Sequence, residues 1–174
     1  IGFASLNQQG LLGAGMQMFS HGIMTALFFA VVGMVYDRAH TRDLSALGGL
    51  FKKMPLAALG FIVAGLVSMG MPGFSGFMAE FPIFMGAWQA MPLVAIIAIL
   101  GVIVTAAYIL LVVRRVFFGA IPEGLEKSVG DVSWMDKVVV GVLAVMMIAL
   151  GWFPSLMTPM IESGVKQILT LVGG

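Results

Sequence analysis

Glu80 and His21 are the two side chains within the long apolar stretches of this chain that can exchange protons near neutral pH. A carboxyl group can take up and release a proton, and an imidazole can do so at two ring nitrogens. Ionisable groups inside apolar spans are costly and are usually functional, so both residues are candidates for a proton relay. The alternatives are a Glu that is bonded to a neighbouring helix by chance and a His with a structural role.

The backbone near Glu80 has an unusual composition. Gly70, Pro72, Gly73 and Gly76 fall within seven residues, and Pro72 lacks the N–H that a continuous helix needs. We expect the helix to break here, although a simple kink is the alternative. Glu80 would then lie about one turn inside the second half-helix, whose positive end favours the anion while desolvation favours the neutral acid. Such a balance suits a group that exchanges a proton.

Depth connects the two candidates. His21 lies nine residues after Leu12, and Glu80 lies nine residues before Gln89, so each is about 14 Å from the outer end of its span. Hydroxyl groups nearby could hold a chain of water, or could equally bond their own helix backbone. These candidates for a polar path are Ser20, Thr25, Ser68, Ser75, Thr105 and Tyr108.

The composition shows what kind of element must position these groups. Of the 174 residues, 60% are hydrophobic and 10% are charged, which is too few charges to cover a water-soluble domain. The net charge of +1 argues against a nucleic-acid partner. The chain has no Cys, which excludes thiolate metal sites and thiol catalysis, and no metal-ligand or cofactor-binding motif is evident. We therefore predict a multi-pass integral membrane protein.

Apolar runs of spanning length predict an all-α, polytopic transmembrane bundle with about four spans, one of them broken, and amphipathic surface helices. The predicted spans cover residues 12–36, 56–89 with a break near 70–76, 93–118 and 138–157. Residues 159–172 carry an apolar stripe at helical spacing and are predicted to lie in the membrane interface. We expect residues 1–174 to form a single transmembrane domain, the C-terminal part of a longer subunit.

Basic residues predict the orientation. Eight of the nine Lys and Arg residues, Lys127 and Lys137 among them, fall in or beside the loops 37–55 and 119–137, and Lys166 lies on the opposite side. Because such loops resist translocation, both should face the cytoplasm or its organellar equivalent. Leu44, Leu47, Leu50 and Phe51 suggest an amphipathic surface helix in the first loop. A solvated basic loop is the alternative there.

Several strings in this sequence, in the same order, resemble the antiporter-like membrane subunits of respiratory complex I and its relatives. They are Gln17-Met18-Phe19-Ser20-His21-Gly22, Tyr36-Asp37-Arg38, His40-Thr41-Arg42-Asp43-Leu44, Leu47-Gly48-Gly49-Leu50, Lys53-Met54-Pro55, Gly70-Met71-Pro72-Gly73, Gly76-Phe77, Ala79-Glu80-Phe81 and Arg115-Val116-Phe117-Phe118-Gly119. The resemblance is strong from Gly10 to about Phe118 and fades after Gly119.

The resemblance implies a proton-translocating subunit built of inverted repeats, of which this chain matches the C-terminal portion. By the resemblance, Glu80 matches the terminal proton-carrying acid, where sister subunits generally carry Lys, and His21 matches a histidine of the proton pathway. The implied partners are other membrane subunits of an NADH-quinone oxidoreductase, and NADH, FMN, iron-sulfur clusters and quinone are expected in those subunits. The alternatives are a cation/proton antiporter, a membrane hydrogenase subunit or a non-pumping scaffold. The implied location is a bacterial plasma membrane or an organellar inner membrane.

Overall fold

The computed structural model describes residues 1–126 and 128–172, and this part of the chain contains helices and no strand. The helices are α1 (Gln8–Ala39), α2 (Pro55–Ser68), α3 (Ser75–Ala90), α4 (Pro92–Phe117), α5 (Glu123–Glu126), α6 (Trp134–Trp152) and α7 (Thr158–Val172). Short 3-10 turns cover Phe3–Ser5, Leu50–Lys52 and Pro154–Leu156. The first long helix therefore begins four residues earlier and ends three residues later than the span expected at 12–36.

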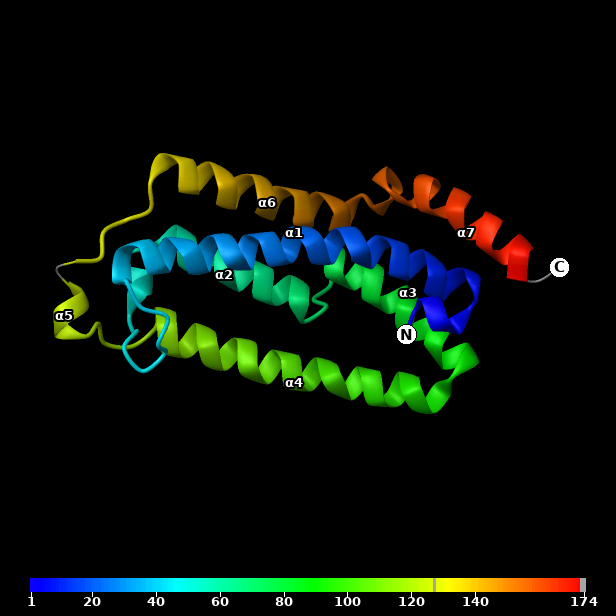
Figure 1. The fold of residues 1–174 in the computed structure, drawn as a ribbon, viewed down its shortest axis with the longest axis horizontal. Helices are drawn as coiled ribbons and strands as arrows, with labels where there is room; N and C mark the ends of the chain where they lie inside the picture. Colours follow the sequence, from blue (N-terminus) through cyan, green and yellow to red (C-terminus); the bar gives the residue numbers. More distant parts are fainter. Residues whose placement is uncertain (127, 173–174) are drawn as a thin grey trace.

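The helices run along one common direction and form a bundle (Figure 1). Among the described residues, α1, α4 and α6 are each long and apolar enough to cross a membrane. The helices α2 and α3, of 14 and 16 residues, follow one another along the bundle, so that together they make a fourth crossing. This arrangement confirms the predicted transmembrane helix bundle with one broken helix. Both termini lie at the same end of the bundle.

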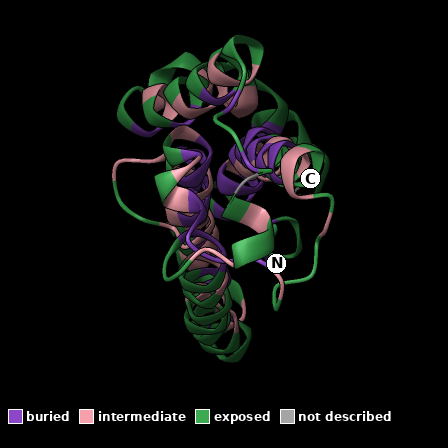
Figure 2. Cartoon of the chain, turned by 90° about the vertical axis from the view of Figure 1, so that its left-hand side faces the viewer, coloured by how far each residue is buried: buried purple, intermediate pink, exposed green. Residues whose placement is uncertain are grey.

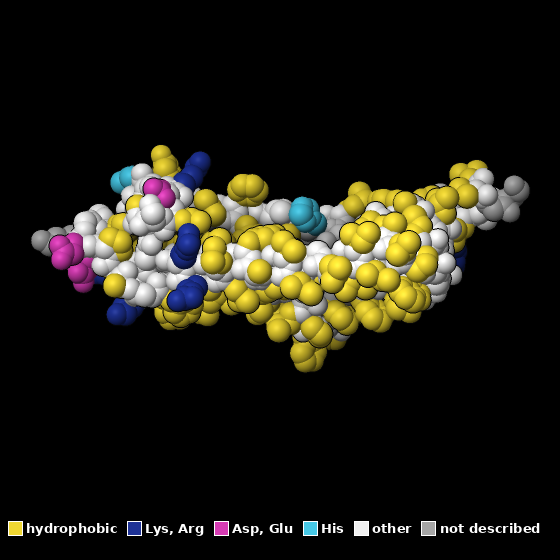
Figure 3. Space-filling view, turned by 90° about the horizontal axis from the view of Figure 1, so that it is seen from below, with side chains coloured by type: hydrophobic (Ala, Val, Ile, Leu, Met, Phe, Trp, Pro, Cys, Tyr) yellow, Lys and Arg dark blue, Asp and Glu magenta, His cyan; other side chains and the backbone are white. Residues whose placement is uncertain are grey.

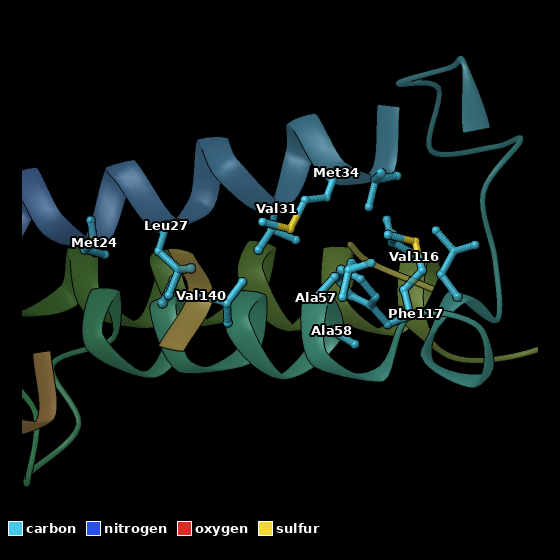
Figure 4. Close-up of a cluster of buried hydrophobic side chains, with 14 of the residues drawn as sticks. Met24, Leu27, Val31, Met34, Ala57, Ala58, Val116, Phe117 and Val140 are labelled. Atoms are coloured by element: carbon cyan, nitrogen blue, oxygen red, sulfur yellow. The ribbon is translucent and has the colours of Figure 1, made fainter. Parts of the chain in front are cut away.

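The core of the bundle lies where α1, α2, α4 and α6 meet (Figure 4). Leu27 and Val31 of α1 are fully buried, and the fully buried Ala57 and Ala58 of α2 belong to the same cluster. Phe117, at the end of α4, is also buried in this cluster. The small residues on α2 let the helix backbones approach closely, which is how membrane helices gain packing energy without a hydrophobic driving force.

The helix α1 is the central element, because it packs against α2, α3, α6 and α7. Its contact with α3 is close at Gly13, where a Cβ atom would lie 2.6 Å from the carbonyl oxygen of Ala79. Asn7 fixes the same end: its Oδ1 accepts from the Gly10 amide at 2.9 Å, and its Nδ2 donates to the Gly86 carbonyl at 2.8 Å. The rotation of α1 against α3 is thereby defined by direct contacts.

The helix α4 is much less covered than α1. Of its side chains, Leu93 is 74% exposed and Ile97 is 69% exposed. Figure 2, where α4 is lowest, shows a mostly exposed helix, whereas the buried residues gather around α1 and α2. An apolar surface of this extent would be unfavourable in water, and it fits an element that lies against lipid or other membrane helices.

The first basic loop differs from expectation. We predicted a surface helix from Leu44, Leu47, Leu50 and Phe51, but the structure has turns there and one short 3-10 turn at Leu50–Lys52. Gly49 has a φ of +63°, which ends any helix at that point. Leu47 and Leu50 are buried in the core cluster, so their apolar side chains serve packing between helices and do not bind the membrane surface.

The C-terminal helix α7 forms as predicted, and it packs against α1. Val165 is its buried residue, and Ile161 lies so close to Gly15 of α1 that a Cβ atom there would not fit. Lys166 is exposed. The helix thus packs against the N-terminal half of α1, while Lys166 and also the apolar Leu171 are exposed.

Positive side chains gather at the end of the bundle opposite to the termini (Figure 3). Arg38 of α1 is tied there to the start of α6: Nη2 lies 2.8 Å from Asp136 Oδ2, and Nε donates to the Asp131 carbonyl at 3.1 Å. Lys137 donates to Asp131 at 3.0 Å, and this hydrogen bond holds the pKa of the Asp131 carboxyl below its ordinary value. Lys127, which the prediction of orientation included, lies outside the described residues.

Candidate functional site

The break between α2 and α3 is a defined turn. The amide of Gly70 bonds to the Val67 carbonyl at 3.1 Å, and the amide of Met71 bonds to the Leu66 carbonyl at 3.0 Å. This pair of bonds around a left-handed glycine, with φ of +65° at Gly70, is a Schellman motif, which satisfies the last carbonyls of α2. The chain then passes Pro72 and Gly73, whose φ is +95°, before α3 begins at Ser75.

The start of α3 is anchored to α1 and to α2. Ser75 and Ser20 are both buried, and their hydroxyl oxygens lie 2.8 Å apart in a hydrogen bond between α3 and α1. Gly76 lies directly against the carbonyl oxygen of Val67, which leaves no room for a side chain. The residues predicted as the hinge therefore hold the two half-helices in a fixed relation and place the first turn of α3 against α1.

Glu80 lies one and a half turns inside α3 and is partly buried. Its Oε1 accepts a hydrogen bond from Gln17 Nε2 of α1 at 3.4 Å. Its Oε2 faces the break, because a Cβ atom on Gly70 would lie only 2.6 Å from it. Each of the two ion pairs found among residues 1–126 and 128–172 involves Asp131 or Asp136, so the carboxyl of Glu80 has no cationic partner in this part of the chain.

A small apolar pocket opens beside this carboxyl. It has a volume of about 120 Å³, and it is lined by Met69, Gly70, Phe77, Glu80, Phe81, Phe84 and Val102. Phe77 and Phe81 are stacked with their ring centroids 5.5 Å apart. Apart from the Glu80 carboxyl, the side chains that line this pocket are aliphatic or aromatic, so the pocket itself offers Glu80 no partner for proton exchange.

His21 is not buried, which corrects the expectation of a relay through two buried groups. Its side chain is exposed on this chain and lines a groove of about 410 Å³ between α1, α2 and α4, together with Thr25, Ser68 and Tyr108. Among the described residues, no hydrogen bond joins His21 to Glu80. The depth of a residue in a span can be counted from the sequence, whereas the side of the helix on which it lies depends on how the helices are rotated.

The predicted polar path is only partly assembled. Ser20 and Ser75 bond to each other, but Thr25 donates to the carbonyls of His21 and Gly22 on its own helix, at 2.7 and 3.1 Å. Thr105 likewise donates to the Gly101 carbonyl at 3.1 Å. Thr25, Ser68 and Tyr108 lie in the same groove as His21, whereas Glu80 lies in the separate pocket at the break.

The contact of Gln17 with Glu80 was not predicted from the sequence. Its amide reaches from α1 to the carboxyl of Glu80, and its Oε1 is a buried atom without a hydrogen-bond partner among the described residues. Gln17 precedes Ser20 by three residues and His21 by four, so the three are neighbours on the surface of α1, although only Gln17 and Ser20 bond to α3. This spacing was the signal available in the sequence.

Within the described ranges, no three His, Asp or Glu side chains come together in a group that could hold a metal ion. The arrangement at the break therefore offers one carboxyl, one amide, two hydroxyls and an apolar pocket. Such a set can bind, orient and transfer a proton.

Comparison with known proteins places this geometry in context. The family model described as NADH:quinone oxidoreductase/Mrp antiporter, TM matches residues 1–118. NADH-quinone oxidoreductase subunit M of Rhodobacter capsulatus is 40% identical over 169 residues, which is 97% of this chain and 33% of that protein. NAD(P)H-quinone oxidoreductase chain 4 1 of a Synechococcus species is 36% identical and covers 91% of this chain and 32% of the relative. The chain thus spans about a third of the length of these relatives.

The fold of this chain is similar to that of chains in two solved membrane complexes. A chain of respiratory complex I from Thermus thermophilus with bound NADH has a TM-score of 0.92 at 26% identity, covering 99% of this chain and 36% of that one. A chain of the Mrp complex from a Dietzia species has a TM-score of 0.86 at 22% identity, covering 97% of this chain and 39% of that one. The second likeness concerns the fold alone.

Proposed function

Because the chain belongs to the NADH:quinone oxidoreductase/Mrp antiporter transmembrane family, we propose that it moves protons across the membrane as a subunit of a redox-driven NADH-quinone oxidoreductase. In this proposal Glu80 is the group that takes up and releases the proton. NADH oxidation, electron transfer and quinone reduction belong to partner subunits, and this chain supplies no redox group. The other membrane subunits of the complex are its direct partners.

The observation that carries the proposal is the environment of the Glu80 carboxyl. It lies within a span, half-buried, with one amide donor at 3.4 Å and no cation beside it in the described structure. A carboxylate that served stability alone would need a cationic partner or several donors to offset its desolvation. A carboxyl that exchanges its proton needs the opposite, an environment in which neither charge state is locked.

The break in the helix gives the proton a route to this carboxyl. The amides in the first turn of α3 have no partners within their own helix, and with the Ser20 and Ser75 hydroxyls they form a polar region beside an otherwise apolar core. Water at such a site is able to bridge hydroxyl, amide and carboxyl groups over short steps. We assign His21 to the next step of the path, through the groove that also holds Ser68 and Tyr108.

The decisive experiment replaces Glu80 in the intact complex and measures proton pumping in reconstituted vesicles. Glu80→Gln keeps the shape but cannot ionise, and it is expected to abolish most of the pumping through this subunit while the complex still assembles. Glu80→Asp keeps an ionisable group on a shorter stem and should retain part of the activity. Glu123→Gln, at an exposed carboxyl on α5, is the matched control and should pump normally.

A passive scaffold predicts a different pattern. Removing a costly, partly buried acid would then be harmless or stabilising, and Glu80→Gln would pump as well as Glu123→Gln. Such a result, in a complex with its full set of subunits, rules out the proposed role of Glu80.

A further inference from the structure

The side chain of Gln17 presents an unusual hydrogen-bonding situation beside Glu80. Its Nε2 donates to Glu80 Oε1 at 3.4 Å, whereas its Oε1 is buried and accepts no hydrogen bond from any described residue. A buried acceptor without a donor is costly, so native structures seldom keep one without a reason. The two atoms belong to one planar amide, so the unpaired oxygen is one amide width from the nitrogen that bonds the carboxyl.

The pairing depends on the charge state of the acid. An ionised carboxylate is only an acceptor, so it can bond to the amide N–H but not to the amide oxygen. A neutral carboxylic acid carries an O–H, and it can donate that hydrogen to the amide oxygen while its carbonyl accepts from the amide N–H. In the described geometry one bond is made, and the amide oxygen has no donor, so it is available as an acceptor for an O–H on the carboxyl.

We propose that Gln17 is a positioning residue for proton transfer, which keeps Glu80 hydrogen-bonded from the same side chain in both of its charge states. With the carboxylate, Nε2–H donates to Glu80; when a proton arrives on the carboxyl, the new O–H donates to Gln17 Oε1, and no other bond is made or broken. The amide thus holds the carboxyl in one orientation through the cycle. This inference rests on the proposed proton exchange at Glu80.

The surroundings of the pair support this assignment. Apart from Glu80, the pocket at the carboxyl is lined by Met69, Gly70, Phe77, Phe81, Phe84 and Val102. No side chain among these carries a nitrogen or oxygen atom that could accept the O–H. Gly70, on the other side, presents backbone only. Among the described side chains, Gln17 is therefore the one that donates to Glu80, and the same amide carries a buried oxygen without a donor.

The test uses the intact complex and an infrared difference spectrum between the oxidised and reduced enzyme. The carboxylic C=O band of Glu80 is identified as the one that Glu80→Gln removes. Gln17→Met has a similar length but neither donor nor acceptor, and it should shift this band to higher frequency, because the acid carbonyl loses the Nε2–H bond. Pumping should fall about fivefold, which corresponds to the loss of one hydrogen bond of about 1 kcal/mol.

Gln9→Met is the matched control, because Gln9 lies on the same helix and its amide bonds only to Gln89 in the described structure. It should leave band and pumping unchanged. Gln17→Asn withdraws the amide by one methylene group and should shift the Glu80 band as Gln17→Met does. Gln17→Asn is used in place of Gln17→Met if the complex that carries Gln17→Met fails to assemble. An unshifted Glu80 band in both Gln17 variants, with pumping equal to that of Gln9→Met, overturns the inference.

The two proposals fail separately. If Glu80→Gln pumps normally and removes no band, then the function proposed for Glu80 is wrong. If Glu80→Gln stops pumping and removes the band, but the Gln17 variants behave as the Gln9 control, the role of Glu80 stands and only the inference about Gln17 falls.

Discussion

At the scale of single residues, the proposed proton transfer centres on one carboxyl and its immediate neighbours. Glu80 has an amide on one side, a bare glycine backbone on the other and an apolar pocket next to it. None of these contacts locks the group as an anion, as a cationic partner would. His21 differs, because its side chain is exposed on this chain and lines a separate groove.

The exposed position of His21 leads to a graded prediction. His21→Asn removes the titratable group, but water in the open groove can take over part of its role, so pumping should fall less than in Glu80→Gln. His40→Asn is the matched control: His40 lies at the far end of α1 with φ of +51°, a conformation that Asn accepts readily. Pumping assays on both variants check this. A His21→Asn variant as inactive as Glu80→Gln would show that the histidine has no substitute.

The residues of this site could be picked out from the sequence, but the contacts between them could not be predicted. Pro72 lacks the N–H that a continuous helix needs, and Gly70 and Gly73 tolerate unusual dihedral angles. The break near Glu80 could therefore be predicted from composition alone. That Gln17 meets Glu80, and that His21 turns outward, depends on the rotation of α1 against α3. This rotation is set by contacts such as those of Asn7 and Gly13, which join residues far apart in the sequence and carry no local signal.

At the scale of elements, the end of α2 is what places the carboxyl. The Schellman motif requires the left-handed Gly70, and the absence of a side chain there makes room for Glu80 Oε2. One glycine thus serves both the turn and the acid. Gly73 is also left-handed, but it does not lie against Glu80. A Cβ atom on Gly73 would meet only Trp152 Nε1, at 3.8 Å.

Alanine at these two glycines should therefore have unequal effects. Both Gly70→Ala and Gly73→Ala force an L-residue into positive φ, at a cost of about 1–2 kcal/mol each. Only Gly70→Ala also pushes against the Glu80 carboxyl, so it should lose pumping in addition to stability. Thermal unfolding in detergent and pumping in vesicles measure the two effects. Equal loss of pumping in both variants would mean that the turn matters and its contact with Glu80 does not.

The junction of α1 with α6 gives a second prediction at this scale. Arg38 bonds to Asp136 and Asp131 in a partly buried site, whereas the Lys137–Asp131 pair is more exposed. Arg38→Gln should lower the free energy of unfolding by about 1–3 kcal/mol, because several charge-assisted bonds are lost. Lys137→Gln should cost less than about 1 kcal/mol, as exposed pairs do. Denaturant unfolding in detergent micelles compares them, and similar losses would contradict a special role for Arg38.

At the scale of the whole molecule, the two ends of the bundle differ in charge. The two termini and α7 lie at one end, and most of the Lys and Arg side chains lie at the other. The number of crossings followed from the sequence because span length and charge are local properties. The structure of the first basic loop could not be predicted in the same way. Leu47 and Leu50 are buried in the core cluster, and their burial depends on contacts between helices that are distant in the sequence.

The sidedness of the bundle is a prediction that labelling can test. The chain has no Cys, so a single introduced Cys reports without background. Ser128→Cys in the basic end should react with an impermeant thiol reagent only from the cytoplasmic side, and Ser163→Cys on α7 only from the opposite side. Both serines are exposed in the structure. Labelling of Ser128→Cys from the outside would reverse the orientation.

The central claim is that Glu80 itself changes its protonation state during turnover, and one spectroscopic measurement tests it most directly. Redox-triggered infrared difference spectra of the intact complex should show a carboxylic C=O band that appears and disappears with turnover, and Glu80→Gln should remove that band while Glu123→Gln keeps it. A Glu80→Gln spectrum that superimposes on the native one would contradict the claim, since the proton would then travel through the complex without ever residing on this carboxyl.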